Sequence, residues 1–176
     1  MRANGEDESK RWFFAAAETL PYQPKHPKLG QLQDDSCVAA CVLMLLRDQG
    51  QEEVYEALLR TALNIRGEGG FISDVPLVLR QFDSQLNYLY RDDLSLFDLV
   101  AATLKEPALV EVRFKDRRGS HALLLDGVEA EAYALIRDPL PRGEGAAYKV
   151  ALETFLAFWL SEKTLVGTWS SSRMKL

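Results

Sequence analysis

The sequence predicts an α+β domain, with an N-terminal helical half packed on a C-terminal antiparallel sheet. Three observations support this fold class. Apolar residues recur at helical spacing through residues 36–82. Short runs rich in β-branched and aromatic residues, separated by polar turns, follow at 108–138. The chain has 176 residues, which suits one domain with its own core.

The first half of the chain begins irregularly and then becomes helical. The aromatic residues 12–14 predict a short helix, and the three prolines of 21–30 predict an extended or turning connection. The run 36–48 is apolar on every side, which predicts a helix buried all round. Two further amphipathic patterns predict helices over 52–64 and 73–82.

The second half alternates more often between polar and apolar residues. The patterns predict strands at 86–90, 108–114, 121–128, 132–138 and 164–169, helices at 94–105 and 151–160, and a flexible connection at 140–147. We therefore expect an irregular N-terminal segment (1–28), one domain (29–168) and a frayed tail (169–176).

Charge and composition exclude several classes of protein. A net charge of −5 disfavours nucleic-acid binding, since the densest basic stretch, KDRRG (115–119), is short. The start of the chain does not have the pattern of a signal peptide, and no apolar run is long enough to cross a bilayer. Two cysteines four residues apart do not form a secreted disulfide framework. We expect a cytoplasmic protein, acting in its own cell or, if it is a delivered toxin, in a target cell.

Cys37 is the candidate nucleophile. It falls in the first turn of the predicted helix 36–48, after Asp35 and Ser36 as possible caps. Unpaired N–H groups and the positive end of the helix dipole favour a thiolate there. A small buried hydrophobe is the alternative for a lone cysteine.

His121 and Asp138 are the candidate partners of this thiol. Of the two histidines, His26 lies in a proline-flanked loop, whereas His121 opens a predicted strand. Asp138 ends the next strand, so antiparallel pairing can bring its carboxylate to the imidazole and hold one tautomer. The alternative for Asp138 is a turn residue before proline.

Gln31 is the candidate oxyanion donor. Its amide lies just upstream of the helix that carries Cys37, so its N–H can point to the same space as the backbone N–H of Cys37. A solvated loop glutamine is the alternative, and Gln33 is the competing donor.

These four residues, in this order and spacing, resemble those of papain-like cysteine peptidases. They resemble most closely the bacteriocin-processing peptidases that cut leader peptides after a double glycine. The resemblance covers residues 29–168 and is carried by QLQDDSCVAACVLM, GGFISDVPLVLRQFD, EPALVEVRF, SHALLLDGV, LIRDPLP and ALETFLAFWL. It implies a papain-like fold, with Cys37 as nucleophile, His121 as general base and acid, Asp138 as its orienting residue and Gln31 as oxyanion donor.

Two residues depart from the family pattern. Ser36 stands where the family usually has aspartate, and Val38 where it usually has glycine, so both can alter the entry of substrate backbone. Cys41 is expected to be a core residue, because one helical turn does not offer disulfide geometry and no fourth metal ligand is present. The pair Gly69-Gly70 is expected to belong to a flexible glycine-rich turn between two helices, with a self-cleavage site as the alternative. No metal and no cofactor is expected.

The resemblance implies a thiol peptidase that hydrolyses bonds after a Gly-Gly pair. Two settings remain open: maturation of a leader peptide, or the toxin domain of an interbacterial effector held in check by an immunity protein. Two other activities also remain open, a papain-like deamidase or acyltransferase and a non-catalytic peptide-binding module. The expected partners are a peptide or protein substrate with a Gly-Gly site and, for a toxin, an immunity protein.

Overall fold

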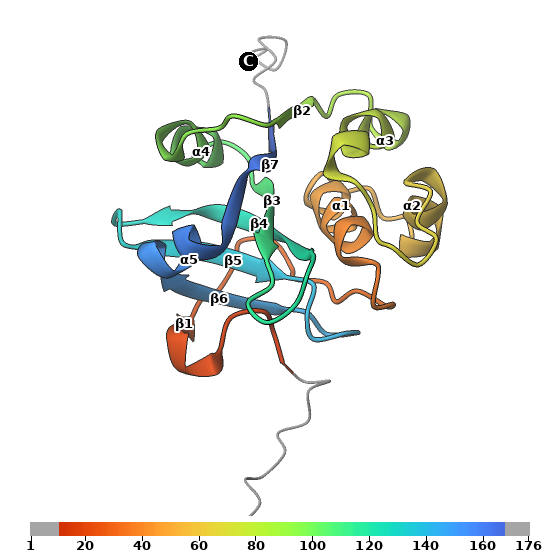
Figure 1. Ribbon diagram of the computed structural model, residues 1–176. Coiled ribbons are helices and arrows are strands. Elements are labelled where there is room, and N and C mark those ends of the chain that lie inside the picture. Colours follow the sequence, from red (N-terminus) through yellow and green to blue (C-terminus); the bar gives the residue numbers. More distant parts are fainter. Residues whose placement is uncertain (1–10, 168–176) are drawn as a thin grey trace, which may run out of the picture.

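The computed structural model describes residues 11–167, which form a helical half packed beside a sheet (Figure 1). The helical half contains three helices and a short 3-10 turn: α1 (Cys37–Asp48), α2 (Glu56–Ala62), η3 (Ile72–Asp74) and α3 (Val75–Phe82). Two more helices flank the sheet, α4 (Leu96–Thr103) and α5 (Leu152–Phe158), and a second 3-10 turn, η2 (Ala16–Glu18), precedes the first strand.

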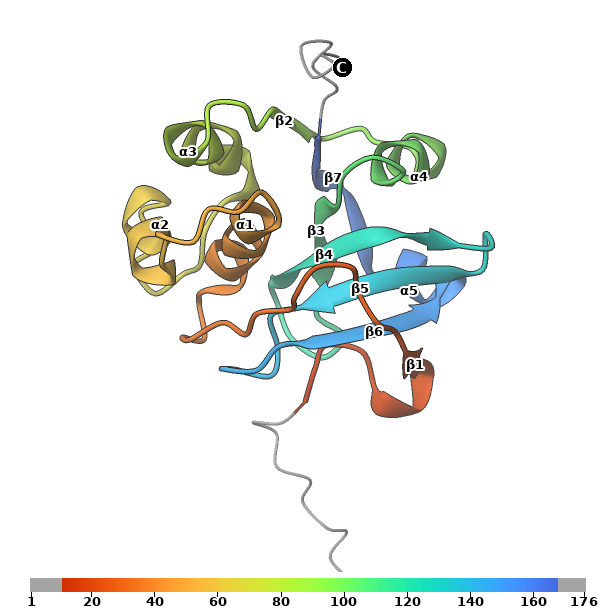
Figure 2. The same ribbon diagram turned by 180° about the vertical axis from the view of Figure 1, so that it is seen from behind.

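All strands of the described residues belong to one seven-stranded antiparallel sheet of order β1-β6-β5-β4-β3-β7-β2. The strands are β1 (Thr19–Pro21), β2 (Tyr88–Arg91), β3 (Ala108–Arg113), β4 (Ser120–Glu129), β5 (Tyr133–Asp138), β6 (Ala146–Ala151) and β7 (Trp159–Gly167). Seen from behind, β4, β5 and β6 are neighbours, β1 lies at the edge beside β6, and the segment that follows β1 crosses a face of these strands (Figure 2). The predicted fold class, helices followed by an antiparallel sheet, is confirmed.

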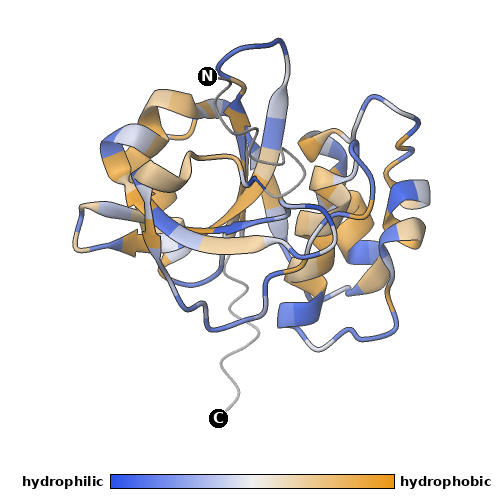
Figure 3. Ribbon diagram, turned by 90° about the horizontal axis from the view of Figure 1, so that it is seen from below, coloured by the Kyte–Doolittle hydropathy of each residue, from blue (hydrophilic) through white to orange (hydrophobic). Residues whose placement is uncertain are grey.

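The central strands are buried on both faces, which explains the unbroken apolar run at residues 122–125 of β4. Successive side chains of a strand point to opposite faces. Leu124 of β4 therefore packs with α1, α2 and α3, whereas Leu123 and Leu125 pack with Phe14, Leu99 of α4 and Phe155 of α5. Hydrophobic residues gather between the layers and hydrophilic residues in the connecting loops (Figure 3). The central strands thus contribute to two hydrophobic cores, one on each face of the sheet.

The C-terminal third differs from the sequence-based expectation. β6 and the start of β7 lie where we predicted a flexible connection and the continuation of a helix over 151–160. Residues of β6 form a strand because their burial alternates with the period of a strand. The glycines just before β6 belong to a tight turn and not to a long flexible loop. Helix α5 ends early because Trp159 pairs with Val112 of β3.

The N-terminal segment is also more ordered than expected. Residues 12–14 form no helix, and β1 adds a strand to the edge of the sheet by pairing with β6. The predicted tail, 169–176, lies outside the described residues. In the part of the chain that is described, no helix has the length and apolar character needed to cross a membrane.

Candidate active site

Cys37 is the first residue of α1, at the end of the helix that faces the sheet. Ser36 occupies the N-cap position, but neither Ser36 nor Asp35 caps the helix with its side chain. Both side chains instead accept hydrogen bonds from Arg60 of α2, and the Asp35 carboxylate also accepts one from the N–H of Gly67 at 2.9 Å. The expected cap is therefore replaced by ties to α2 and to the loop after it. These ties fix the start of α1 and leave the thiol partly exposed.

His121 and Asp138 meet as the antiparallel pairing predicts. His121 lies near the start of β4, Asp138 ends β5, and the imidazole Nε2 is 2.8 Å from the carboxylate Oδ1. Both side chains are almost fully buried. Because Nε2 contacts the carboxylate, Nδ1 is the ring nitrogen left for the thiol, and His121 and Cys37 share a hydrogen bond.

The carboxylate of Asp138 accepts hydrogen bonds on both oxygens. In addition to His121, Oδ1 accepts the N–H of Leu140 at 2.9 Å. Oδ2 accepts the hydroxyl of Tyr148 at 2.7 Å and the N–H of Phe13 at 2.9 Å. A buried carboxylate with this many donors is held in one orientation and stays ionised.

The three groups shift one another's pKa values in the directions that a nucleophile needs. Burial raises the pKa of the Cys37 thiol, but the hydrogen bond and charge of His121 and the backbone N–H groups of Ala122 and Val38 outweigh it and lower that pKa. Burial disfavours a charged His121, but Asp138 and Cys37 outweigh it and raise the imidazole pKa to about 10. The pKa of Asp138 is lowered, against its burial, chiefly by His121. Together these shifts favour a thiolate–imidazolium pair near neutral pH.

Gln31 lies in the loop before α1, buried at 2 % exposure. Its Nε2 donates to the carbonyl oxygens of Gln33 at 2.8 Å and Asp34 at 3.1 Å. Its Oε1 is buried and has no hydrogen-bond partner among the described residues. The Gln31 side chain therefore stabilises the loop that leads to Cys37. Its amide N–H groups already donate to two carbonyl oxygens, so one of them would have to be shared with a substrate oxygen.

Three residues that support the site were missed by the sequence analysis. Tyr148 and Phe13 bond to Asp138, and the buried Glu56 of α2 accepts the N–H of Leu32 with both carboxylate oxygens, at 3.1 and 3.0 Å. The spacing of these residues along the chain carried no signal. Only the burial of a glutamate in an amphipathic helix could have pointed to Glu56.

Val38 and the Gly69-Gly70 pair lie against each other beside α1. Val38 is 2 % exposed, and a Cβ on Gly70 would lie 3.4 Å from the Val38 Cβ and 3.2 Å from Ile65. Gly69 has φ +83°, a conformation that favours glycine. The Val38 side chain thus packs against the loop 66–70. The departure from the expected glycine at this position therefore affects the contact between α1 and that loop.

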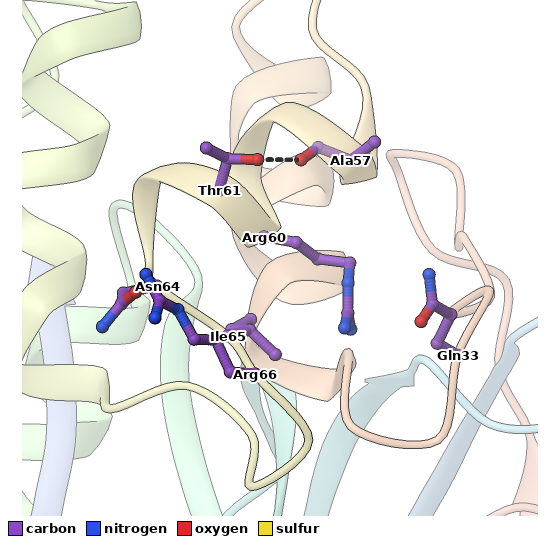
Figure 4. A pocket seen from close by; sticks show the side chains of 7 residues that line it. All are labelled: Gln33, Ala57, Arg60, Thr61, Asn64, Ile65 and Arg66. Carbon is purple, nitrogen blue, oxygen red and sulfur yellow. Dashed lines mark hydrogen bonds between the residues drawn. The ribbon is translucent and has the colours of Figure 1, made fainter.

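A surface pocket of about 290 Å³ lies between α2, the start of this loop and Gln33 (Figure 4). Arg60 extends from α2 towards Gln33 across the pocket, and Arg66 borders it. The pocket is next to the start of α1 but contains none of the three paired groups.

Cys41 is a free, fully buried cysteine, as expected for a core residue. Burial raises the pKa of its thiol well above the usual value. His26 pairs with Asp48, at 3.9 Å, and not with either cysteine. The described residues contain no cluster of three or more histidine, cysteine, aspartate or glutamate side chains that could hold a metal ion.

Comparisons with solved structures find this arrangement of elements elsewhere. No protein-family model and no curated protein matches the sequence significantly. A double glycine motif protease from an AMS/PCAT transporter, solved with its leader peptide, matches with a TM-score of 0.61 and 21 % identity over 83 % of this chain and 93 % of that one. The peptidase domain of Streptococcus ComA, a bifunctional ABC transporter of a quorum-sensing pathway, matches with a TM-score of 0.63 and 19 % identity over 82 % of this chain and 100 % of that one. This chain therefore has the papain-like α+β fold of double-glycine peptidase domains of ABC transporters.

Proposed function

We propose that the protein is a cysteine peptidase that hydrolyses a peptide bond after a Gly-Gly pair, with Cys37, His121, Asp138 and Gln31 as its catalytic residues. One observation carries the proposal: a thiol at a helix N-terminus shares a hydrogen bond with a buried imidazole, which is 2.8 Å from a buried carboxylate. The fold shared with double-glycine peptidase domains supports the choice of substrate.

In the proposed first step, the Cys37 thiolate attacks the carbonyl carbon of the scissile bond. The carbonyl oxygen takes the electron pair and becomes an oxyanion. When the intermediate collapses, the C–N bond breaks and the imidazolium of His121 gives its proton to the leaving amine. The products are a thioester that joins the N-terminal part of the substrate to Cys37 and a released C-terminal fragment with a free amine.

In the second step, neutral His121 takes a proton from water and the resulting hydroxide attacks the thioester carbonyl. The C–S bond breaks, the carboxylic acid product leaves and loses its proton to solvent, and the thiolate–imidazolium pair is restored. Asp138 keeps the imidazole in one orientation through both steps, because its own contacts to Leu140, Phe13 and Tyr148 hold it in place.

The oxyanion would be held by the backbone N–H of Cys37 and by the amide of Gln31. The first N–H groups of a helix have no partner within the helix and carry its positive end. The Gln31 amide would share one hydrogen with the substrate while the Gln33 and Asp34 carbonyls keep the side chain in place. Glu56 would support this loop through its bonds to the N–H of Leu32.

The preference for Gly-Gly would come from a narrow cleft that admits only backbone before the scissile bond. A methyl group forced into a closed slot costs about 1–3 kcal/mol, which slows cleavage roughly ten- to hundredfold. Two matched peptides test the proposal, one with Gly-Gly and one with Gly-Ala before the cut. We expect a higher kcat/KM for the Gly-Gly peptide and no cleavage of either by Cys37→Ala. Equal kcat/KM values would refute the specificity, and cleavage by Cys37→Ala would refute the mechanism.

The same assay separates the alternative activities. A deamidase would convert a glutamine side chain and leave every peptide bond intact, which mass spectrometry detects. A binding module would retain the peptide equally in wild type and Cys37→Ala, with no product from either.

The setting, toxin or leader-peptide maturation, needs a cellular test. Wild type and Cys37→Ala would be expressed at matched soluble levels in the cytoplasm of an ordinary bacterial host, followed by a search for newly cleaved host proteins. A toxin stops growth only as wild type. Equal growth, together with cleavage of a Gly-Gly leader supplied to the cell, supports maturation instead.

A further inference from the structure

The flat face of His121 is covered by Phe13, a residue of the N-terminal segment. The two rings are nearly parallel, at 9°, with centroids 5.7 Å apart. The backbone N–H of Phe13 donates at 2.9 Å to Oδ2 of Asp138, the partner of that histidine. One residue therefore contacts both members of the buried pair, with its ring on the imidazole and its N–H on the carboxylate.

The position of Phe13 is fixed by its neighbours on both sides. Trp12 stacks on Tyr148, with centroids 6.0 Å apart, and the Tyr148 hydroxyl donates to the same carboxylate oxygen as Phe13. Phe14 is 3 % exposed and belongs to the core beneath the sheet.

Further along the segment, β1 pairs with β6, and the Tyr22 hydroxyl donates to Asp126 at 2.9 Å. The segment is thus anchored along its length, and its contact with the pair does not depend on a single side chain.

Covering the pair with an apolar ring changes its electrostatics. The attraction between an imidazolium and a carboxylate weakens when water enters between them, because the effective dielectric constant rises. The titratable groups that face the pair are Cys37 from α1 and Tyr148 from β6. None of residues 12–14 titrates, so Phe13 can act only by excluding water and by its N–H.

We propose that Phe13 is a positioning residue of the active site, which keeps His121 and Asp138 dry and oriented so that Cys37 remains a thiolate. This rests on the proposed roles of those three residues. It assigns to the N-terminal segment, which precedes the nucleophile, a part in activating it.

The test measures the rate of alkylation of Cys37 by iodoacetamide against pH in the full chain, together with the melting temperature. We expect Phe13→Ala to move the midpoint of the profile upward by about 1 pH unit, so that alkylation well below the midpoint slows about tenfold. Phe13→Tyr keeps a flat ring and should stay within about 0.3 units of wild type. The control Leu20→Ala, at an exposed position of the same segment, should leave the midpoint unchanged.

A purely structural role predicts a different pattern. Phe13→Ala would then lower the melting temperature without moving the midpoint, and that result would overturn the proposal. If Phe13→Ala does not fold, Phe13→Gln keeps most of the volume but brings a polar amide to the imidazole. An unchanged midpoint in that variant would overturn the proposal equally. Failure of the proposed function looks different again: wild-type Cys37 would titrate as an ordinary thiol, or would titrate low while no Gly-Gly peptide is cleaved.

Discussion

Cys37 and Cys41 lie one helical turn apart in α1, yet their surroundings shift the pKa values of the two thiols in opposite directions. Cys37 meets His121 and two backbone N–H groups, so its pKa is lowered. Burial among apolar neighbours raises the pKa of Cys41, and the negative charges of Cys37 and Asp138 raise it further. Two identical side chains on one helix therefore differ in chemistry because of what the sheet brings to each.

We predict that iodoacetamide modifies Cys37 and spares Cys41 at about pH 6. A lowered pKa means that the thiolate persists as pH falls and is lost only when pH passes through that pKa. His121→Ala removes the main partner and should raise the midpoint of the Cys37 profile by about 2 pH units. Peptide mass spectrometry after timed alkylation measures both. Equal labelling of the two cysteines would contradict the assigned environments.

For Gln31 we predict that replacement by alanine lowers kcat about 10²-fold with little change in KM, the scale of one oxyanion donor. Gln33→Ala is the matched control, because the Gln33 carbonyl that accepts from Gln31 belongs to the backbone and survives the change. Peptide kinetics with the Gly-Gly substrate measure both variants. A rise in KM with unchanged kcat would instead show that Gln31 only shapes the loop.

At this scale the sequence predicted which candidate side chains would come together better than it predicted the residues that hold them. Cys37, His121 and Asp138 could be identified because each is a chemically distinctive residue at the start or end of a predicted element. Phe13 and Tyr148 could not, since aromatic residues are ordinary core material and their contacts join opposite ends of the chain. The engagement of the Gln31 amide with two carbonyls was also beyond pattern reading, because it depends on how the loop folds.

Two connecting segments are pressed together where the site is assembled. The Gln31 N–H donates to the Pro139 carbonyl at 2.9 Å, and the Gly143 N–H donates to the Gln31 carbonyl at 3.0 Å. A Cβ on Gly30 would lie 2.4 Å from the Glu144 nitrogen, so only glycine fits there. This contact joins the loop before α1 to the loop after β5, and so sets Gln31 relative to Asp138.

We predict that Gly30→Ala destabilises the protein by about 2 kcal/mol or more, because backbone on both sides must move apart. The same movement separates Gln31 from the end of β5, so kcat should fall as well. Gly127→Ala is the control: nothing lies within 4 Å of its Cβ. Urea unfolding and peptide kinetics measure the two effects. Equal stability of both variants would rule out the close contact.

The elements themselves were predictable where their pattern is long and regular. The helix at 36–48 and the strands at 108–138 are found almost as expected, because each carries a clear period of apolar residues. β6 was missed because its alternation is short and follows a glycine-rich turn that resembles a loop. The end of α5 was placed too late, since pairing of Trp159 with β3 overrides the local helical pattern.

The two halves of the molecule are joined by a buried charge network around Arg137. This side chain is fully buried and donates to Asp48 of α1 at 2.9 and 2.7 Å and to Asp126 of β4 at 2.9 and 3.0 Å. It also donates to the Pro27 carbonyl in the N-terminal segment. Arg137 directly precedes Asp138, so this network fixes the strand end that carries the carboxylate.

We predict that Asp48→Asn lowers the free energy of unfolding by about 3 kcal/mol, because it leaves the buried guanidinium with half of its charge partners. The partly exposed pair of Lys149 and Glu129 gives the control, and Glu129→Gln should change stability by less than about 1 kcal/mol. Urea unfolding at neutral pH compares them. Equal losses in the free energy of unfolding for Asp48→Asn and Glu129→Gln would contradict a larger stabilising role for the buried network.

The contact of Phe13 with His121 and Asp138 has a consequence for the order of events during synthesis. Phe13 is translated 125 residues before Asp138, and also before His121 and Tyr148. Pairings so distant in sequence form late, because their loop must close first. We therefore expect a nascent chain to carry Cys37 as an ordinary thiol until His121, Asp138 and Tyr148 have been translated and packed against Phe13.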